Sequence, residues 1–589
     1  MLVYGDIVRP CAPVDLVAEM HVAIVRAEAA AGLNRHAALV SALIAAGELL
    51  QAVADAEFVE SGRDAPSPAQ DAITALASDL AHLVRASWLS LSSAHPRAGG
   101  DPGVFDPDDQ AAEKGWAPAF AGVSGKLELL ATLPLPERLQ VKQPEGYAFY
   151  ALYPEAYVEA AAALPPGSDW RVLGLRSIGT SLAAAVAAAL EAPPPLTARP
   201  SGHPFARTLE LAPELAASVG FGQRFAVVDE GPGLSGSSFG VALDLLEAQG
   251  APRDRLHVFP GHGGDLGPQA SDAHRARWSA VSRHVVSFDA LLLESGRLQF
   301  WAKDLVGPVI APLEDLSGGG WRALAFPGAT DLPPSNAAQE RRKFLLRTAD
   351  GAWLLKFAGL GRIGERKLER ARALHAAGFT PEPAGLVHGF LVERWIEPAT
   401  RAPPIPVDHL ARYLRFRRDR FPAEPGASAA ELFEMARVNT TEALGEGAAA
   451  ALDRFRRRLH EFAVATRPVE VDARLHPWEW LAAPDGLLLK TDALDHHAAH
   501  DLVGAQDIAW DVAGAVVELG LDSEDAERLR AHLDTPPDQV AFMTVAYCAF
   551  QLGYWSMAAD AHAGWPEEAA RLSTARNRYA DRLRALLDA

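Results

Sequence analysis

The most informative segment of the sequence is Phe225-Ala-Val-Val-Asp-Glu-Gly-Pro-Gly-Leu-Ser-Gly-Ser-Ser238. Its apolar start predicts a buried strand that ends at two adjacent carboxylates, Asp229 and Glu230, and its Gly/Ser loop leads into a helix that begins near Ser237. At the carboxyl end of a parallel strand, the free amides of such a loop and of the helix N-terminus favour an anion. The two acids suit vicinal hydroxyls or a magnesium ion instead. A ribose 5-phosphate satisfies both requirements.

Short strand-like runs alternate with helical segments on both sides of this stretch. They lie at residues 171–175, 182–190, 225–228, 241–249 and 256–259. Strands that alternate with helices predict a mainly parallel sheet with helices on its faces. We expect this α/β domain over residues 131–303.

A second strand-loop-helix signal lies upstream, in Val172-Leu-Gly-Leu-Arg-Ser-Ile-Gly-Thr-Ser-Leu182. Between the two loops, residues 199–207 are polar, basic and rich in Gly and Pro. The order of these features resembles that of the type I phosphoribosyltransferases, whose 5-phosphoribosyl-1-pyrophosphate (PRPP) motif has apolar residues, two acids and a small-residue loop. Serine stands here where threonine is usual, and an unusual Gly-Pro-Gly follows the acids. The alternative interpretation is an ordinary turn of a doubly wound sheet.

The resemblance implies a site for PRPP and magnesium. Asp229 and Glu230 would bind the ribose hydroxyls and the metal, with Arg176 as a third catalytic residue. The phosphate and diphosphate groups would be bound by Ser235, Gly236, Ser237, Ser238, Gly179, Thr180 and Ser181, and by the flap cations Arg199, His203 and Arg207. The implied reaction transfers the phosphoribosyl group to a small-molecule acceptor and releases diphosphate.

Residues 304–589 predict a small β-rich lobe followed by a helical lobe. Trp353-Leu-Leu-Lys-Phe357 places Lys356 on a strand, and Leu487-Leu-Leu-Lys-Thr-Asp492 ends a second strand at Asp492. This arrangement resembles the aminoglycoside-phosphotransferase branch of the kinase-like fold. The resemblance implies ATP phosphates on Lys356, an ion pair from Glu365 or Glu369 to that lysine, and magnesium on Asp492.

The expected catalytic loop is Asp472-Ala-Arg-Leu-His-Pro-Trp-Glu479. Aligned on Leu475-His476-Pro477, Arg474 falls where the family has its general-base aspartate, and Glu479 falls where it has a metal-binding asparagine. We expect His476 and Glu479 near the nucleotide. Because arginine cannot accept a proton, both phosphotransfer and nucleotide binding without transfer stay open.

A pair of histidines follows, His496 and His500, at the spacing that a zinc site on a helix needs. The glutamate of the zinc peptidase signature is missing between them. A polar segment near the nucleotide, or a solvated loop, fits these residues better than a hydrolytic zinc site.

Residues 1–130 predict amphipathic helices and a Gly/Pro/Asp-rich linker at 95–109. The helices carry little chemistry, so we expect a packing module or a route to homo-oligomers. With Lys and Arg totalling 55 against 75 Asp and Glu, the net charge of −20 argues against broad binding to nucleic acid or anionic membrane.

A chain of 589 residues is too long to fold around one hydrophobic core, so we expect several domains. Two cysteines exclude a disulfide framework. Neither a charged leader nor an uninterrupted apolar run of about 18 residues is present, which favours the cytoplasm.

The combined signals predict a multidomain α/β enzyme. The leading hypothesis is a PRPP-dependent phosphoribosyltransferase fused to an ATP-binding kinase-like domain. The alternatives are a regulatory protein that senses PRPP or nucleotide without turnover, and a small-molecule kinase.

Overall fold

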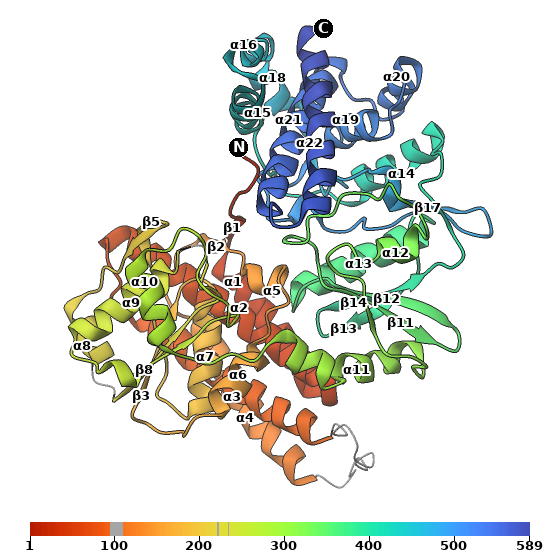
Figure 1. Ribbon diagram of the computed structural model, residues 1–589. Helices are drawn as coiled ribbons and strands as arrows, with labels where there is room; N and C mark the ends of the chain where they lie inside the picture. Colours follow the sequence, from red (N-terminus) through yellow and green to blue (C-terminus); the bar gives the residue numbers. More distant parts are fainter. Residues whose placement is uncertain (95–109, 221–222, 234) are drawn as a thin grey trace.

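The computed structural model describes residues 1–94, 110–220, 223–233 and 235–589, and it shows a multidomain α/β protein with several sheets (Figure 1). The linker expected at 95–109 lies outside the described residues. One half of the protein is organised by a five-stranded parallel sheet and the other half by a five-stranded antiparallel sheet.

The parallel sheet has the strand order β4 (Leu196–Ala198), β3 (Trp170–Leu175), β7 (Arg224–Val228), β8 (Leu256–Phe259), β9 (Ser282–Arg283). Alternate residues of β7 pack into different cores: Phe225 and Val227 face one cluster, Ala226 and Val228 another. A strand buried on both faces reads as a continuous apolar run, which is why the sequence signal is strong. Helices α7 (Gly179–Leu190) and α9 (Ser237–Ala248) follow β3 and β7.

The remaining elements of this half surround the sheet. They are the hairpin β5 (Ser201–His203) and β6 (Ala206–Thr208), the helices α5 (Glu145–Ala148), α6 (Pro154–Ala162), α8 (Pro213–Gly220), α10 (Asp272–Ala280) and α11 (Arg297–Val306), and the antiparallel pair β1 (Val8–Cys11) and β2 (Leu139–Lys142).

The N-terminal helices pack against this half. They are α1 (Pro13–Ala29), α2 (Gly32–Ser61), α3 (Pro68–Ala94) and α4 (Gln110–Leu130). An added Cβ on Gly47 of α2 would lie 2.7 Å from the Cβ of Ser181, so α2 and α7 approach closely. Core residues of both ranges form one cluster. The apolar stripes expected for a separate module are therefore used inside the chain, while the boundary at residue 130 and homo-oligomer formation stay predictions.

Helix α2 is the one described helix whose length and composition would allow it to cross a membrane. In its most apolar window, 83% of the residues are buried inside the protein. Its polar residues also have partners there: Gln51 Oε1 accepts from the amide of Lys142 at 3.2 Å. The apolar surface of α2 thus belongs to the protein's own core.

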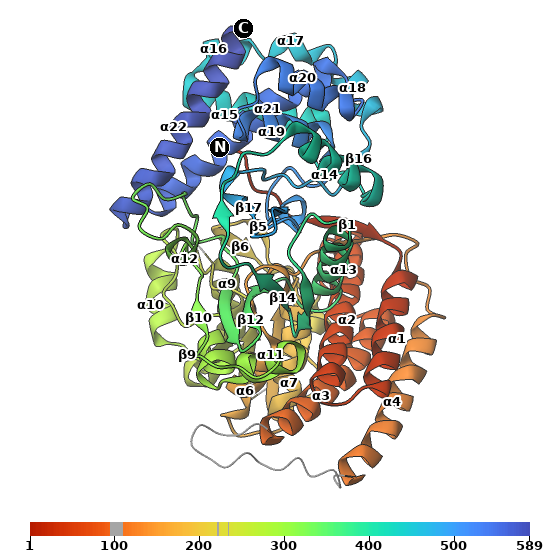
Figure 2. The same cartoon turned by 90° about the vertical axis from the view of Figure 1, so that its right-hand side faces the viewer.

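The antiparallel sheet has the strand order β10 (Glu314–Asp315), β11 (Lys343–Thr348), β12 (Gly351–Phe357), β14 (Phe390–Trp395), β13 (Pro383–Val387), and helix α13 (Arg362–Ala376) packs on it. This is the expected small lobe. The larger helical lobe lies beyond it, at the opposite end of the molecule from the N-terminal helices (Figure 2).

The helical lobe contains α14 (Val407–Arg420), α15 (Ala429–Leu444), α16 (Glu446–Ala450), α17 (Asp453–Arg456), α18 (Leu459–Ala465), α19 (Ala509–Glu518), α20 (Ser523–His532), α21 (Pro537–Ala561) and α22 (Pro566–Asp588). Its short strands are β15 (Thr400–Arg401), β16 (Pro468–Val469), β17 (Trp480–Ala482), β18 (Leu488–Lys490) and β19 (Gln506–Asp507). Helix α12 (Arg322–Ala325) precedes the antiparallel sheet.

Buried polar contacts join the two halves. Glu155 of α6 is fully buried, and its Oε1 lies 2.7 Å from Nε2 of His36 and 2.7 Å from Nε2 of His388, in the turn between β13 and β14. Nearby, Arg362 of α13 binds the buried carboxylate of Glu48 on α2 with two nitrogens, one of them at 2.8 Å. The N-terminus adds a third link, because the amide of Leu502 donates to the carbonyl of Val3.

The Glu48–Arg362 pair has a matched control. Arg26 and Glu365 join the same helical regions at 2.8 Å, but their side chains are 59% and 41% exposed, against 3% for Glu48. We expect Glu48→Gln to destabilise the protein by about 3 kcal/mol, because it removes the buried, two-nitrogen counter-charge of Arg362 and leaves only the contact to Glu19 at 3.3 Å. Glu365→Gln is expected to cost less than about 1 kcal/mol, because water screens an exposed pair.

Urea denaturation followed by tryptophan fluorescence measures both changes. Equal effects of the two substitutions would contradict a structural role for the buried pair.

Candidate functional site

The first candidate site is a cavity of about 200 Å³ between the antiparallel sheet and the helical lobe, called here the C-terminal cleft. Strands β12 and β14 supply Leu354, Lys356 and Glu393, and the helical lobe supplies Arg474, Glu479 and Asp492. The cleft therefore has an apolar end, with Leu354, and a charged end, where Lys356 of the sheet meets the carboxylates of the helical lobe.

Lys356 projects from β12 toward the helical lobe. Its ammonium group pairs with Asp492 and lies 3.6 Å from Oδ1 of Asp495. Burial alone would lower the pKa of Lys356, but the two carboxylates outweigh it and hold that pKa above its ordinary value. The lysine is thus a fixed positive charge facing a carboxylate that follows β18.

Neither glutamate expected beside Lys356 is there. Glu365 pairs with Arg26, and Glu369 is exposed, because both lie on the outer face of α13. The inner face carries Lys367, whose Nζ lies 2.9 Å from Oδ2 of Asp495. The expected pairing is therefore wrong. The helical spacing of the residues on the buried face of α13 could have indicated this orientation: Gly364, Lys367, Ala371 and Leu374.

The loop between β16 and β17 is fixed by hydrogen bonds to Asp511 of helix α19. The two carboxylate oxygens of Asp511 accept the amides of Asp472 and Ala473, both at 2.8 Å. His476 lines the cleft, but its Nδ1 lies 3.1 Å from Glu518, and its ring stacks on Trp478. His476 therefore anchors the loop to helix α19.

Three side chains at the charged end have metal-ligating atoms within 4.8 Å of one another: Glu479, Asp492 and His496. Oε2 of Glu479 also lies 2.7 Å from Nζ of Lys490. Carboxylate oxygens are the ligands that magnesium and manganese prefer. The donor set fits a divalent cation bound beside Lys356.

The two histidines considered for zinc do not form a pair. His496 lies in a single turn of 3-10 helix that ends at Ala498, so no helical face joins it to His500. Nδ1 of His500 lies instead 2.8 Å from Oε1 of Glu145, on the other half of the protein. Both side chains line the C-terminal cleft, which fits the polar segment that the sequence favoured over a zinc pair.

The second candidate site is a largely polar cavity of about 220 Å³ at the carboxyl ends of β3 and β7, called here the sheet-edge cleft. Its lining includes Asp6, Lys142, Glu145, Arg176, Ser177, Arg199, Arg207, Asp229, Glu230 and Ser238. Of the residues that the resemblance assigns to PRPP, this cavity is lined by Arg176, Arg199, Arg207, Asp229, Glu230 and Ser238.

Asp229 and Glu230 line this cleft and form no ion pair among the described residues. Oε2 of Glu230 accepts from the amide of Gly146 at 3.2 Å, and Oδ1 of Asp229 accepts from the amide of Glu230. Burial raises the pKa of Asp229 to about 7 and that of Glu230 to about 8. The two acids are thus poised to bind either hydroxyls or a cation.

The loop that follows is covered by the β5–β6 hairpin. The hydroxyls of Ser235 and Ser237 both donate to the carbonyl of Pro204 at the hairpin's turn, at 3.1 and 2.7 Å. Gly236 has φ 66°, a conformation that favours glycine. Ser238 lines the cleft. The expected flap therefore lies on the expected phosphate loop, where its turn occupies two serine hydroxyls.

The upstream loop has a mainly packing role in this structure. An added Cβ on Gly179 would lie 2.6 Å from the carbonyl oxygen of Val228, so β7 and α7 touch there. The hydroxyl of Thr180 donates to the carbonyl of Ser177, and that of Ser181 lies 2.9 Å from the hydroxyl of Tyr147. Both hydroxyls are buried.

The cations expected to bind diphosphate divide into two groups. Arg176 has a fully buried side chain that pairs with Asp55 and Asp64, and Arg199 also pairs with Asp55. By contrast, His203 is exposed, and Arg207 lines the cleft with one nitrogen on the carbonyl of Gly202. Sequence reasoning missed Asp55 and Asp64, because they lie more than 100 residues upstream of Arg176.

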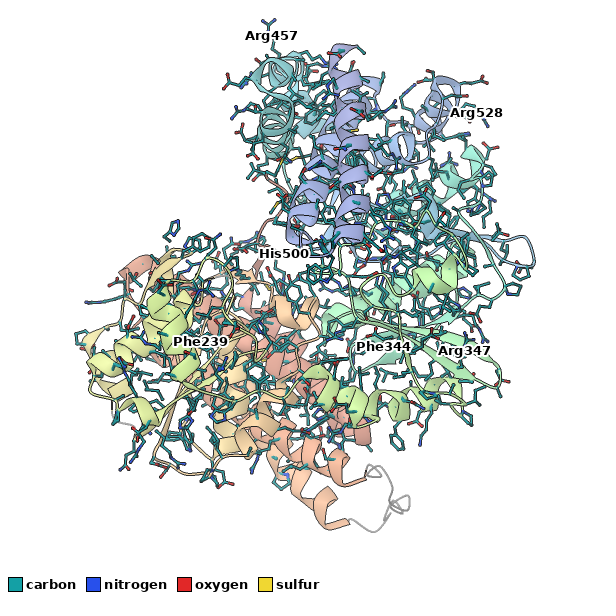
Figure 3. All side chains as sticks on the ribbon, viewed as in Figure 1. Phe239, Phe344, Arg347, Arg457, His500 and Arg528 are labelled. Atoms are coloured by element: carbon teal, nitrogen blue, oxygen red, sulfur yellow. The ribbon has the colours of Figure 1, made fainter. Side chains whose placement is uncertain are left out.

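The two clefts share a wall made by residues 145–150. Glu145 lines the sheet-edge cleft, while Tyr150 and His500 line the C-terminal cleft. The ion pair between Glu145 and His500 crosses this wall, and Figure 3 shows His500 at the junction of the two halves. Pairing with Glu145 raises the pKa of His500.

Comparison with solved structures finds similar folds among phosphotransferases. The choline kinase LicA from Streptococcus pneumoniae is 16% identical with a TM-score of 0.33, and the match covers 48% of this chain and 98% of LicA. A choline/ethanolamine kinase family protein from Mesorhizobium loti is 16% identical with a TM-score of 0.29, covering 50% of this chain and all of the other.

An aminoglycoside phosphotransferase from Alicyclobacillus acidocaldarius is 15% identical with a TM-score of 0.25, covering 42% of this chain and 89% of the other. No family model matches the chain, and no curated protein matches it. These comparisons give no support to the phosphoribosyltransferase resemblance. All three TM-scores lie below 0.5, so the function of each cleft is inferred from its geometry.

The raised pKa values at the sheet-edge cleft make stability depend on pH. A folded-state pKa of about 7 or 8 exceeds the ordinary values of 3.8 and 4.5, so the folded protein binds these protons more tightly than the unfolded chain. Their contribution to stability is complete below about pH 4 and is lost as pH rises to about 8.

We therefore expect the wild type to lose stability relative to the Asp229→Asn, Glu230→Gln variant between about pH 5 and pH 9. Denaturation of both proteins across this range, with magnesium chelated, measures the difference. A difference that does not change with pH would show that these carboxyls are already ionised in the folded protein.

Proposed function

We propose that the C-terminal cleft binds a nucleoside triphosphate with a divalent cation and transfers its terminal phosphoryl group to a small molecule. The observation that carries this proposal is the pairing of Lys356 with Asp492 across the cleft, between β12 and the end of β18. A lysine and a metal-binding carboxylate that face each other are what a bound triphosphate and its metal need.

Each part of the cleft has a role in this proposal. The apolar end, with Leu354 and the last residues of β14, would hold the base. Lys356 would exchange its carboxylate partner for phosphate oxygens, and Lys367 would keep Asp495 neutralised meanwhile. Asp492 and Glu479 would hold the metal, which when bound offsets the charge of the phosphates. Catalysis would then rest on positioning and charge stabilisation.

This proposal predicts nucleotide binding that depends on both partners of the ion pair. We expect Lys356→Met and Asp492→Asn each to weaken binding of magnesium AMP-PNP by about tenfold or more, because each removes a charged contact. Titration calorimetry measures the affinities. Lys126→Met is the matched control, because Lys126 pairs with Asp79 on the N-terminal helices. Nucleotide binding that survives both substitutions would refute the assignment.

The sheet-edge cleft supports a second candidate function, PRPP binding. The specific observation is that Asp229 and Glu230, without ion-pair partners among the described residues, face a cavity that Ser238 and Arg207 also line. In the enzyme version of this proposal, the bond from ribose C1 to the diphosphate breaks and a nucleophile bonds to C1. In the sensor version, PRPP binds without turnover.

Direct binding separates this second function from the first. We expect magnesium PRPP to bind the wild type and the Asp265→Asn control, since Asp265 lies on an exposed loop. We expect Asp229→Asn with Glu230→Gln to weaken binding by about tenfold or more, through loss of the contacts to metal and hydroxyls. Diphosphate release in the presence of acceptors identifies an enzyme, and its absence identifies a sensor. Equal affinity of both variants would exclude this site.

A further inference from the structure

The guanidinium of Arg474 stands at the charged end of the C-terminal cleft without a carboxylate partner. Its carbon lies 4.9 Å from the centre of the Tyr554 ring, and it forms no ion pair in the part of the chain that the structure describes. The lysines nearest to these carboxylates are paired: Lys356 with Asp492, Lys367 with Asp495, and Lys490 with Glu479. Arg474 is thus a half-buried positive charge that faces the cavity.

The groups around it are poor proton acceptors. The three carboxylates just named are each bound to a lysine. His496 is one of the three side chains whose donor atoms suit a cation, and its Nδ1 lies 3.2 Å from the carbonyl oxygen of Asp472. Arginine itself carries no lone pair for a proton. A hydroxyl acceptor, which must give up its proton during phosphoryl transfer, therefore finds no free base among these groups. Glu393 on β14 also lines the cleft and forms no ion pair among the described residues.

An acceptor that is already an oxyanion has no such requirement. A carboxylate or phosphate carries no proton on its attacking oxygen, and its charge must be held close to the charged phosphates of the nucleotide. A guanidinium suits this task, because it binds carboxylate and phosphate with two parallel hydrogen bonds.

We propose that Arg474 binds the acceptor and that the acceptor of the C-terminal cleft is an oxyanion, a carboxylate or a phosphate, instead of a hydroxyl compound. This inference rests on the proposed nucleotide function. One oxygen of the acceptor attacks the γ-phosphorus, and the bond from that phosphorus to the β,γ-bridging oxygen breaks. The electron pair leaves with the nucleoside diphosphate, and no proton is transferred. The product is a mixed anhydride, an acyl phosphate or a phosphoanhydride.

Tyrosine side chains make the same end of the cleft suitable for a polar anion. Tyr554 supports the guanidinium from one side, and Tyr150, 45% exposed, lines the cavity from the shared wall. A cationic acceptor would instead meet the positive charge of Arg474 at close range, which is unfavourable in a partly buried site.

Binding gives the first test. With the protein saturated by magnesium AMP-PNP, we expect succinate or inorganic phosphate to bind the wild type and choline not to bind. Arg474→Gln is expected to weaken oxyanion binding by about tenfold or more. Arg474→Lys is expected to lie between, because it keeps the charge but loses the paired geometry. Arg584→Gln is the control, since Arg584 is exposed on α22.

Turnover gives the second test and separates the two oxyanion sources. With ATP, carboxylate probes (acetate, succinate) yield acyl phosphates that hydroxylamine traps as hydroxamates, and phosphate probes yield anhydrides seen by phosphorus NMR. Phosphorylation of choline or glycerol, or oxyanion affinity unchanged in Arg474→Gln, would overturn the inference. If AMP-PNP itself does not bind, the proposed nucleotide function fails and this inference fails with it; if it binds and no oxyanion does, only the inference fails.

Discussion

The arrangement of the C-terminal half depends on an alternating set of buried charges: Lys356, Asp492, Asp495 and Lys367. Each carboxylate contacts a lysine from the small lobe, and both carboxylates follow strand β18 of the helical lobe. Since leaving any one of these charges unpaired would be costly in a buried setting, the set fixes how the two lobes face each other. The same charges give the cleft its polarity, because they place lysines of the small lobe opposite the carboxylates that follow β18. The pairing of these four charges therefore determines both the orientation of the two lobes and the charge distribution of the cleft.

The N-terminal region likewise supplies carboxylates that pair with buried cations in both halves of the protein. Asp55 and Asp64 neutralise Arg176 and Arg199 at the edge of the parallel sheet, and Glu48 neutralises Arg362 below the antiparallel sheet. One helical layer thus supplies counter-charges to both sheets. The two clefts are also structurally connected. Residues 145–150 contribute to the walls of both, and the Glu145–His500 ion pair crosses this shared wall.

Much of the local structure could be read from the sequence, because it rests on short-range patterns. The strand that ends at Asp229, the loop into α9, the strand that carries Lys356 and the position of Asp492 all follow from apolar runs and loop residues. The errors have a common cause. The partners of Arg176, Glu365 and His500 come from segments more than 100 residues away, and no local pattern encodes them. Only the orientation of α13 could have been corrected from the sequence, since its buried positions repeat at helical spacing.

The central claim is that the Lys356–Asp492 pair marks the binding place of a metal-bound triphosphate. A crystal structure with AMP-PNP and manganese tests it most directly, because manganese is located by its anomalous scattering. The account predicts an anomalous peak within bonding distance of Asp492, with the ammonium of Lys356 moved from the carboxylate to phosphate oxygens. A nucleotide bound elsewhere, or a manganese peak away from Asp492 with the lysine–aspartate contact intact, would contradict it.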